Sequence, residues 1–297
     1  MKKQLLAIAS LAFVLSGCSN ATTTIQSGSD PLFSVGDIAY TKADEYNFQK
    51  KSNGATGVIQ LALKTIYEKE VGLTDSIKKE AKKQVQESSK DVENFEKQIK
   101  NMGYTSIQDY TDKVIVPSVQ SDRLIEKYMK VNKKEVQTKF KPSMAYVVEC
   151  ADEETAKQAL ADLKDGKEFK DVYDAYSKEN SLIHSDLKFI STQSQDVPTR
   201  LVNTLSSTKK AGIIDEIFFN EGMEETTYYV AILDSNDYDK NLKQFAKNLK
   251  DTSHLSQDCL LYYLDLYQFE VHDQELFDTF KANNPEYLVT RPDLSKK

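Results

Sequence analysis

Apolar residues recur at three- and four-residue intervals over long stretches of the chain, which is the spacing of one face of an amphipathic helix. Between residues 78 and 100 the other positions are rich in Lys and Glu, as on a solvated helix face stabilised by weak ion pairs. The pattern therefore predicts helices near both ends of the chain, over residues 58–67, 77–99, 105–117, 118–128, 242–249 and 255–269.

The middle of the chain has a different pattern, in which short apolar runs alternate with helical stretches. The runs are rich in β-branched and aromatic residues and predict strands. The predicted strands are 144–150, 187–190 and 228–233, and the predicted helices are 154–164 and 169–177. We therefore predict an α+β fold class, in which an α+β domain of about 95 residues is inserted into a helical lobe built from the N- and C-terminal segments.

The N-terminus has the pattern of a secretion signal. Lys2 and Lys3 precede an apolar run, residues 5–15, that is too short to cross a bilayer, because a spanning helix needs about 20 residues. The run ends in Leu15-Ser16-Gly17-Cys18, which resembles a bacterial lipobox, where the Cys thiol receives a diacylglyceryl group. The sequence thus predicts a lipoprotein signal peptide at 1–17 and lipid attachment at Cys18. An ordinary signal peptide is the alternative.

The residues that follow Cys18 are small and polar through Asp30, with too little apolar surface to fold. We predict that residues 18–34 form a flexible tether. Two cysteines remain, Cys150 and Cys259. A disulfide between them suits an oxidising exterior, whereas the end of a strand-like run and the middle of a helical run suit two buried free thiols, so both interpretations stay open.

Composition excludes several classes of function. The chain has 297 residues, of which 39% are hydrophobic and 29% charged, and a net charge of −7. These values are typical of a folded soluble protein, and an acidic chain with interspersed charges does not favour binding to nucleic acid. Three His and three Cys, well scattered, argue against a metal site made of those ligands. No phosphate-binding glycine loop or nucleophile motif occurs, and no cofactor is expected.

Short motifs follow one another in order behind the lipobox. They are Val35-Gly36-Asp37 with Tyr40-Thr41-Lys42-Ala43-Asp44-Glu45, Val131-Asn132-Lys133-Lys134-Glu135-Val136, Thr155-Ala156-Lys157, Leu163-Lys164-Asp165-Gly166-Lys167-Glu168-Phe169, Tyr176-Ser177, Asp186-Leu187 and Val271-His272-Asp273-Gln274-Glu275-Leu276. The series resembles the PrsA foldase lipoproteins of Gram-positive bacteria, whose inserted domain is a parvulin-type peptidyl-prolyl isomerase. The resemblance implies an N-terminal helical chaperone part at 35–142, a parvulin-like domain at 143–236, and a C-terminal helical part at 237–297 that packs on the N-terminal part.

The resemblance weakens at the catalytic residues. Parvulins carry one His in the first strand, another in the last strand, and a Cys or Asp between them. Here Tyr146 lies in the first strand, Tyr229 takes the His position of the last strand, and Glu179 falls near the acidic position after Tyr-Ser. His184 occupies a position where glycine is expected and is not carried over as catalytic. The resemblance therefore implies a degenerate parvulin site, with Phe189 and Tyr228 as candidates for binding peptide.

The expected function is that of a foldase and chaperone, anchored in the cell membrane of a Gram-positive bacterium on its extracytoplasmic face. Its expected partners are unfolded or newly translocated secreted proteins and the membrane, and a homodimer stays open. The family activity, prolyl cis-trans isomerisation, is expected to be weak or lost without the two His. The alternative is a solute-binding lipoprotein of a transporter, against which the scarcity of glycine argues. A structural or adhesive surface lipoprotein is a third class, but the chain has no internal repeats.

Overall fold

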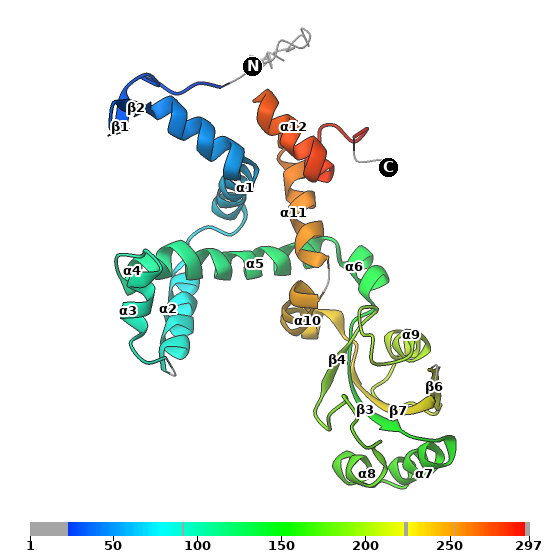
Figure 1. The fold of residues 1–297 in the computed structure, drawn as a ribbon. Helices are drawn as coiled ribbons and strands as arrows, with labels where there is room; N and C mark the ends of the chain where they lie inside the picture. Colours follow the sequence, from blue (N-terminus) through cyan, green and yellow to red (C-terminus); the bar gives the residue numbers. More distant parts are fainter. Residues whose placement is uncertain (1–22, 91, 223–224, 253, 295–297) are drawn as a thin grey trace, which may run out of the picture. The chain divides into compact units, whose positions relative to one another are not determined.

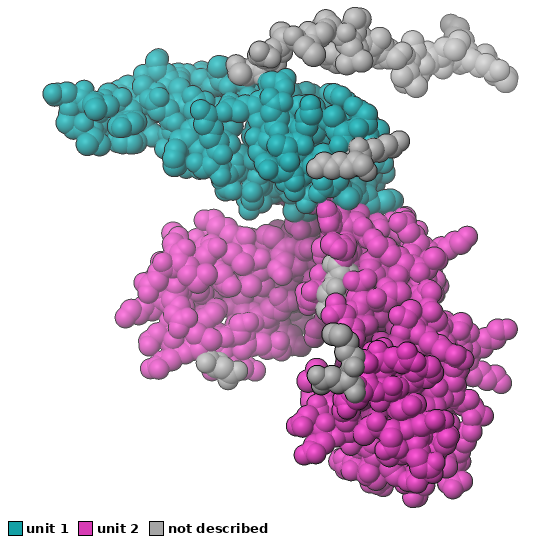
Figure 2. All heavy atoms as spheres, turned by 45° about the vertical axis from the view of Figure 1, so that its right-hand side comes forward, with its two compact units in different colours: residues 1–63, 261–297 teal, residues 64–260 magenta. Residues whose placement is uncertain are grey.

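The computed structural model describes residues 23–294 except 91, 223–224 and 253, so the predicted signal peptide and Cys18 lie outside the described residues. The chain divides into two compact units (Figure 2). One comprises residues 1–63 and 261–297, and the other comprises residues 64–260. Among the described residues, no helix is both long enough and apolar enough to cross a bilayer.

The first unit joins the two ends of the chain. A hairpin of β1 (Pro31–Val35) and β2 (Ile38–Thr41) leads into α1 (Lys42–Glu70), whose first part belongs to this unit. From the other end come the last residues of α11 (Leu255–Leu266), then α12 (Gln274–Asn283) and a 3₁₀ turn, η2 (Pro285–Tyr287). Residues 31–34 of the predicted tether are thus part of β1.

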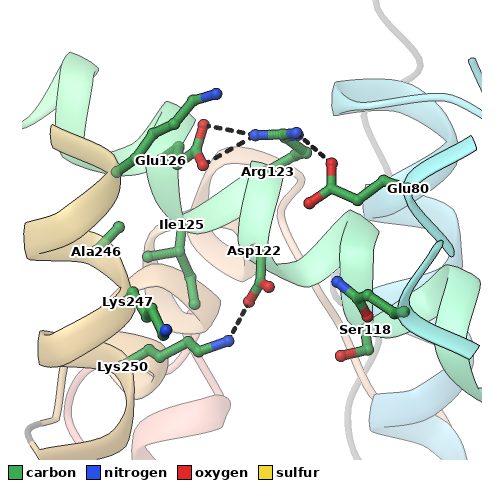
Figure 3. Close-up of a pocket in the computed structure, with 11 residues that line it drawn as sticks. Glu80, Ser118, Asp122, Arg123, Ile125, Glu126, Ala246, Lys247 and Lys250 are labelled. Carbon is green, nitrogen blue, oxygen red and sulfur yellow. Dashed lines mark hydrogen bonds and ion pairs between the residues drawn. The ribbon is translucent and has the colours of Figure 1, made fainter. Parts of the chain in front are cut away.

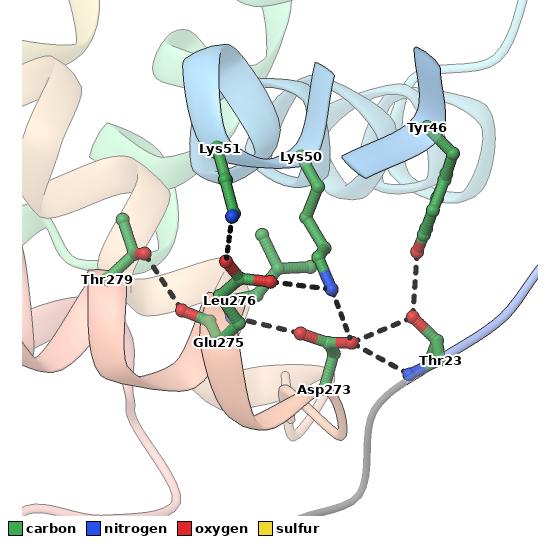
Figure 4. Close-up of polar contacts among 8 residues, drawn as sticks. All are labelled: Thr23, Tyr46, Lys50, Lys51, Asp273, Glu275, Leu276 and Thr279. Carbon is green, nitrogen blue, oxygen red and sulfur yellow. Dashed lines mark hydrogen bonds and ion pairs between the residues drawn. The ribbon is translucent and has the colours of Figure 1, made fainter. Parts of the chain in front are cut away.

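A polar cluster connects α1 with the start of α12 (Figure 4). Asp273 caps α12 by accepting from the backbone N–H of Leu276, and it also accepts from the N–H and hydroxyl of Thr23 at 2.9 and 2.8 Å. The Nζ of Lys50 lies 3.4 Å from Asp273 and 2.8 Å from Glu275. Burial by itself raises the pKa of Asp273, but these hydrogen bonds together hold the pKa well below its usual range.

We expect the contribution of Asp273 to the free energy of unfolding to fall as the pH is lowered. Its pKa is lower in the folded chain than the value of about 3.9 of an exposed aspartate, so its contribution is complete above about pH 5 and is lost as the pH falls below about 4. Wild type and Asp273→Asn should differ in free energy of unfolding by a constant amount between about pH 5 and pH 8, and by less toward pH 2. Urea unfolding at each pH measures this, and a difference that grows on acidification would contradict it.

The second unit begins with a group of helices. Ile77 and Ala81 of α2 pack on Val116 and Val119 of α5, and α5 also packs on α10. Pro117 lies in the first turn of α5, directly after a π-helical turn. The helices are α2 (Asp75–Lys90), α3 (Phe95–Asn101), α4 (Ile107–Tyr110), a π-helical turn η1 (Thr111–Ile115), α5 (Val116–Val131), α6 (Lys133–Phe140) and α10 (Tyr238–Thr252).

The sheet of the second unit is antiparallel throughout its described pairs. Its central strands are β3 (Ser143–Cys150) and β7 (Thr226–Ser235), in the order β4-β3-β7-β5, with β6 also paired to β7. The other elements are β4 (Lys188–Ile190), β5 (Gly212–Ile213), β6 (Phe218–Glu221), α7 (Glu153–Lys164), α8 (Phe169–Tyr176) and α9 (Thr199–Ser207). The predicted strands 144–150 and 228–233 are therefore confirmed as parts of β3 and β7, and the predicted strand 187–190 is confirmed as β4 with a start one residue later, at Lys188.

The predicted fold class is confirmed: the chain is α+β, with an α+β domain inserted between helical segments (Figure 1). Segments from the two ends of the sequence meet in both units, α1 with α12 in the first and α5 with α10 in the second. Gly54 permits the first of these contacts, because a Cβ at this position would lie only 2.6 Å from a methyl carbon of Leu276.

The two cysteines of the second unit are free. Cys150 in β3 and Cys259 in α11 are both buried, so the structure favours the thiol interpretation over the disulfide. Burial raises the pKa of each thiol to about 12, and neighbouring carboxylates add to the rise. Since the thiolate is the reactive form of cysteine, neither side chain is suited to nucleophilic chemistry.

Candidate functional site

The two faces of the β3–β7 pair carry different clusters of side chains. Val148, Cys150 and Val230 pack on α7 and α8, through residues such as Leu160 and Val172. The opposite face carries Ala145, Val147, Tyr229 and Ala231, which cluster with Leu201 and Leu205 of α9. Because side chains alternate between faces along a strand, neighbouring positions in β3 or β7 belong to different clusters.

The structure does not bring together Tyr146 and Tyr229, the candidates from the first and last strands of the inserted domain. The ring of Tyr146 lies 5.0 Å from that of Phe169, on the face covered by α7 and α8. Tyr228 packs against the same face. Tyr229 lies on the face covered by α9. The cluster with Tyr229 contains Val147, the strand neighbour of Tyr146, and not Tyr146 itself.

The other candidates lie apart from Tyr229 as well. Phe189 of β4 packs against Phe245 of α10, with ring centroids 5.8 Å apart. Glu179 is exposed in the loop after α8, and His184 is exposed a few residues later. Of the five residues predicted from the parvulin resemblance, Tyr146 and Tyr228 thus share one face of the sheet, whereas Tyr229, Phe189 and Glu179 lie elsewhere, so the five do not form one cluster.

Two residues that the sequence did not single out accompany Tyr229. Glu149 of β3 is its cross-strand partner, and the carboxylate of Glu149 accepts a hydrogen bond from the Ser181 hydroxyl at 2.5 Å. The backbone carbonyl of Glu149 accepts from the N–H of Lys178 at 2.6 Å, and Lys178 forms an ion pair with Glu225. The signal that relates Glu149 to Tyr229 is the register of β3 on β7, which becomes visible only in the paired strands.

This cluster offers a phenol, a carboxylate and a hydroxyl, with the chemistry of hydrogen bonding rather than of proton transfer at neutral pH. Burial raises the pKa of Tyr229 to about 12, and the charges of Glu149 and Asp196 add to the rise, so the phenol stays protonated and can only donate or accept a hydrogen bond. Tyr229 is 4% exposed within its apolar cluster. A bound peptide would have to displace packed side chains to reach it.

A cavity of about 460 Å³ lies between α2, α5 and α10 in the same unit, and its lining is charged (Figure 3). Arg123 of α5 pairs with Glu126 of its own helix and with Glu80 of α2, and Lys250 of α10 lies 2.5 Å from Asp122. In these ion pairs, charged side chains of the cavity lining neutralise one another. Its polar lining does not suit an apolar peptide or a proline ring.

An apolar cavity of about 420 Å³ lies in the first unit, between the hairpin and the start of α1. It is lined by Phe33, Tyr40 and Phe48 together with Asp44 and Glu45. The rings of Phe33 and Tyr40 stack with their centroids 4.9 Å apart. Among the described residues, no group of three or more His, Cys, Asp or Glu is arranged to hold a metal ion.

No protein-family model matches the chain, and no curated protein matches it. Solved structures similar to it include the foldase protein PrsA from Streptococcus pneumoniae, at 18% identity and a TM-score of 0.43, over 86% of this chain and 99% of that one. A peptidylprolyl isomerase (PrsA) from Bacillus cereus has 17% identity and a TM-score of 0.46 over the same shares. PrsA from Bacillus subtilis has 18% identity and a TM-score of 0.39, over 85% and 98%. Such values assign neither an activity nor a site to this chain.

Proposed function

We propose that this protein is a foldase that binds exported polypeptides while they are unfolded and assists their folding. The observation that carries the proposal is where the PrsA-like motifs fall in the fold. Thr155 opens α7, its N–H bonded to the capping carboxylate of Asp152, residues 163–169 join α7 to α8, and Tyr176-Ser177 closes α8. All of them lie in the α+β domain that is inserted between helical segments.

The inserted α+β domain is better suited to binding a polypeptide than to catalysing the isomerisation of its X-Pro bonds. An X-Pro bond rotates over a barrier of about 18–20 kcal/mol, and a catalyst needs an apolar pocket for proline with a polar network that fits the twisted amide. Here the polar groups are the buried, protonated Tyr229 with Glu149 and Ser181, and no His occurs in β3 or β7. We therefore expect prolyl isomerase activity to be weak or lost.

The proposal includes attachment to the extracytoplasmic face of the cell membrane through a lipid on Cys18. It is supported by the lipobox-like Leu15-Ser16-Gly17-Cys18 and by the two acyl chains that such a residue carries, which give stable anchoring. The proposed partners are unfolded or newly translocated secreted proteins. The alternative, a solute-binding lipoprotein, is not favoured, because the described strands pair antiparallel and form no pair of βα-repeat lobes.

The test uses residues 19–297, which contain every described residue, in two assays side by side. We expect the protein to suppress aggregation of an unfolded secreted protein and to accelerate prolyl isomerisation in a peptide by less than about tenfold. We expect Tyr229→Phe to change neither result, because the phenol is buried away from a bound peptide. Strong isomerisation that Tyr229→Phe abolishes would overturn the proposed loss of catalysis, and absence of aggregation suppression would overturn the foldase proposal.

A further inference from the structure

The hairpin of the first unit has one strongly apolar face. Phe33 pairs with Tyr40 and Val35 pairs with Ile38, so these four side chains share one face, whereas Ser34 and Ala39 pair on the other. Their exposed fractions are 49% for Phe33, 41% for Tyr40, 65% for Val35 and 63% for Ile38. Phe48 of α1, which is 64% exposed, lines the same cavity as Phe33 and Tyr40. We call these five residues the hairpin surface.

The hairpin surface is unusual for the outside of a folded protein. Large apolar side chains that are exposed singly are common, but a contiguous group indicates a site of interaction. The hairpin also has only two strands in the described structure, and a two-stranded sheet by itself is marginally stable in water. A partner that covers the apolar face would stabilise it.

The charges around the hairpin surface indicate the chemistry of that partner. Residues 30–48 contain four acidic side chains and one basic one, a net charge of −3. The one basic side chain, Lys42, pairs with Asp30 at 2.8 Å. Of the other acidic side chains, Asp37 lies at the turn, and Asp44 and Glu45 line the cavity. Asp44 accepts hydrogen bonds from the N–H and hydroxyl of Thr41, and Glu45 accepts one from Gln49, so neither is paired with a cation by these bonds. A second copy of this surface, or an anionic bilayer, would bring negative charge against negative charge.

We propose that the hairpin surface binds extended polypeptide segments that carry apolar side chains together with Lys or Arg. Phe33, Tyr40 and Phe48 would cover the apolar side chains of the segment, and Asp44 and Glu45 would attract its cations. The inference rests on the proposed foldase function and names the part of the chain that holds the client. It differs from the inserted domain, where the aromatic candidates Tyr146, Phe189 and Tyr229 pack against other side chains.

The test measures binding of a fluorescent unstructured peptide, rich in Phe, Leu and Lys, to residues 19–297 by fluorescence anisotropy. A matched peptide has Glu in place of every Lys. We expect the Lys peptide to bind at least about fivefold more tightly than the Glu peptide. The double variant Ile38→Ser/Phe48→Ser should weaken binding about tenfold, since both side chains lose their apolar contact. The variant Glu45→Lys keeps the apolar face and should remove the preference for the Lys peptide.

The matched control is Leu182→Ser/Phe219→Ser, which removes two exposed apolar side chains, 81% and 51% exposed, from the other unit. We expect it to bind both peptides as wild type does. Thermal unfolding followed by circular dichroism checks that each variant folds. Equal binding by wild type and Ile38→Ser/Phe48→Ser, or an unchanged preference in Glu45→Lys, would overturn the proposal.

Further measurements separate this proposal from its alternatives and from the proposed function. A dimer in sedimentation that Ile38→Ser/Phe48→Ser abolishes, or vesicle binding that it abolishes, would overturn the proposal in favour of a second copy or a bilayer. If wild type suppresses aggregation and the double variant does so equally, the hairpin proposal fails and the foldase function stands. If wild type binds the Lys peptide through the hairpin but does not suppress aggregation, the foldase function fails and the site stands.

Discussion

Replacement of Asp273 by Ala should lower the free energy of unfolding of the first unit by about 3 kcal/mol. The side chains of Asp273 and Lys50 are only 3% and 5% exposed. Breaking such a pair leaves one charge buried with fewer partners, although Glu275, at 2.8 Å, still compensates part of the charge of Lys50. The substitution also removes the cap of α12 and the acceptor for Thr23.

The control for this substitution is Asp278→Ala on the same helix. Asp278 is exposed and accepts a hydrogen bond from Gln274, four residues earlier on the same helix. We expect a change within about 0.5 kcal/mol, as for an ordinary surface position. Hydrogen exchange of the α12 amides and urea unfolding measure both variants. Equal effects of the two substitutions would show that the cluster around Asp273 contributes no more than a surface ion pair.

Helices were the most predictable part of this fold, because each buries one stripe of apolar residues and the stripe is visible in the sequence. The limits of that reasoning appear between residues 77 and 99, where one stripe corresponds to two helices, α2 and α3. Asn94, before α3, has a φ of 57°. The spacing of apolar residues does not predict this left-handed conformation, which depends on local backbone geometry.

The candidate site was less predictable, because it depends on the register of the strands and on the face of the sheet that each side chain occupies. A shift of one residue moves a side chain to the other face of a sheet. Matching the motifs by approximate position selected Tyr146, which contacts Phe169. Val147, the next residue of β3, is the one that lies in the cluster of Tyr229. Glu149 was missed for the same reason, since its relation to Tyr229 is a cross-strand pairing between residues 80 positions apart.

The hairpin surface illustrates a different limit. The predicted tether extends to residue 34, whereas Pro31–Val35 form β1 of a hairpin whose turn contains Gly36, with a φ of 59°. In this hairpin Phe33, Val35, Ile38 and Tyr40 alternate with Ser34 and Ala39 and share one apolar face. An alternating pattern normally implies that the apolar face is buried. Whether another part of the same chain covers that face depends on tertiary packing, and in the described structure Val35 and Ile38 stay more than 60% exposed.

Replacement of Phe245 by Ala should lower the free energy of unfolding of the second unit by about 4 kcal/mol. Phe245 of α10 is fully buried, and its ring contacts those of Phe189 in β4 and Tyr238 at the start of α10. Its removal leaves a cavity where the helix meets the sheet, and chemical denaturation of the purified variant measures the cost. The control Phe219→Ala, at a position 51% exposed, should cost less than about 1 kcal/mol.

The same pair of rings separates two roles of Phe189. If Phe189 mainly packs on Phe245, Phe189→Ala in a Phe245→Ala background should cost about 1 kcal/mol less than in wild type, because the ring contact is already lost. If Phe189 mainly served to bind peptide, the two substitutions would be additive in stability and Phe189→Ala alone would weaken binding of the Lys peptide. We expect the first result, since the contact with Phe245 joins the inserted sheet to α10 within the second unit.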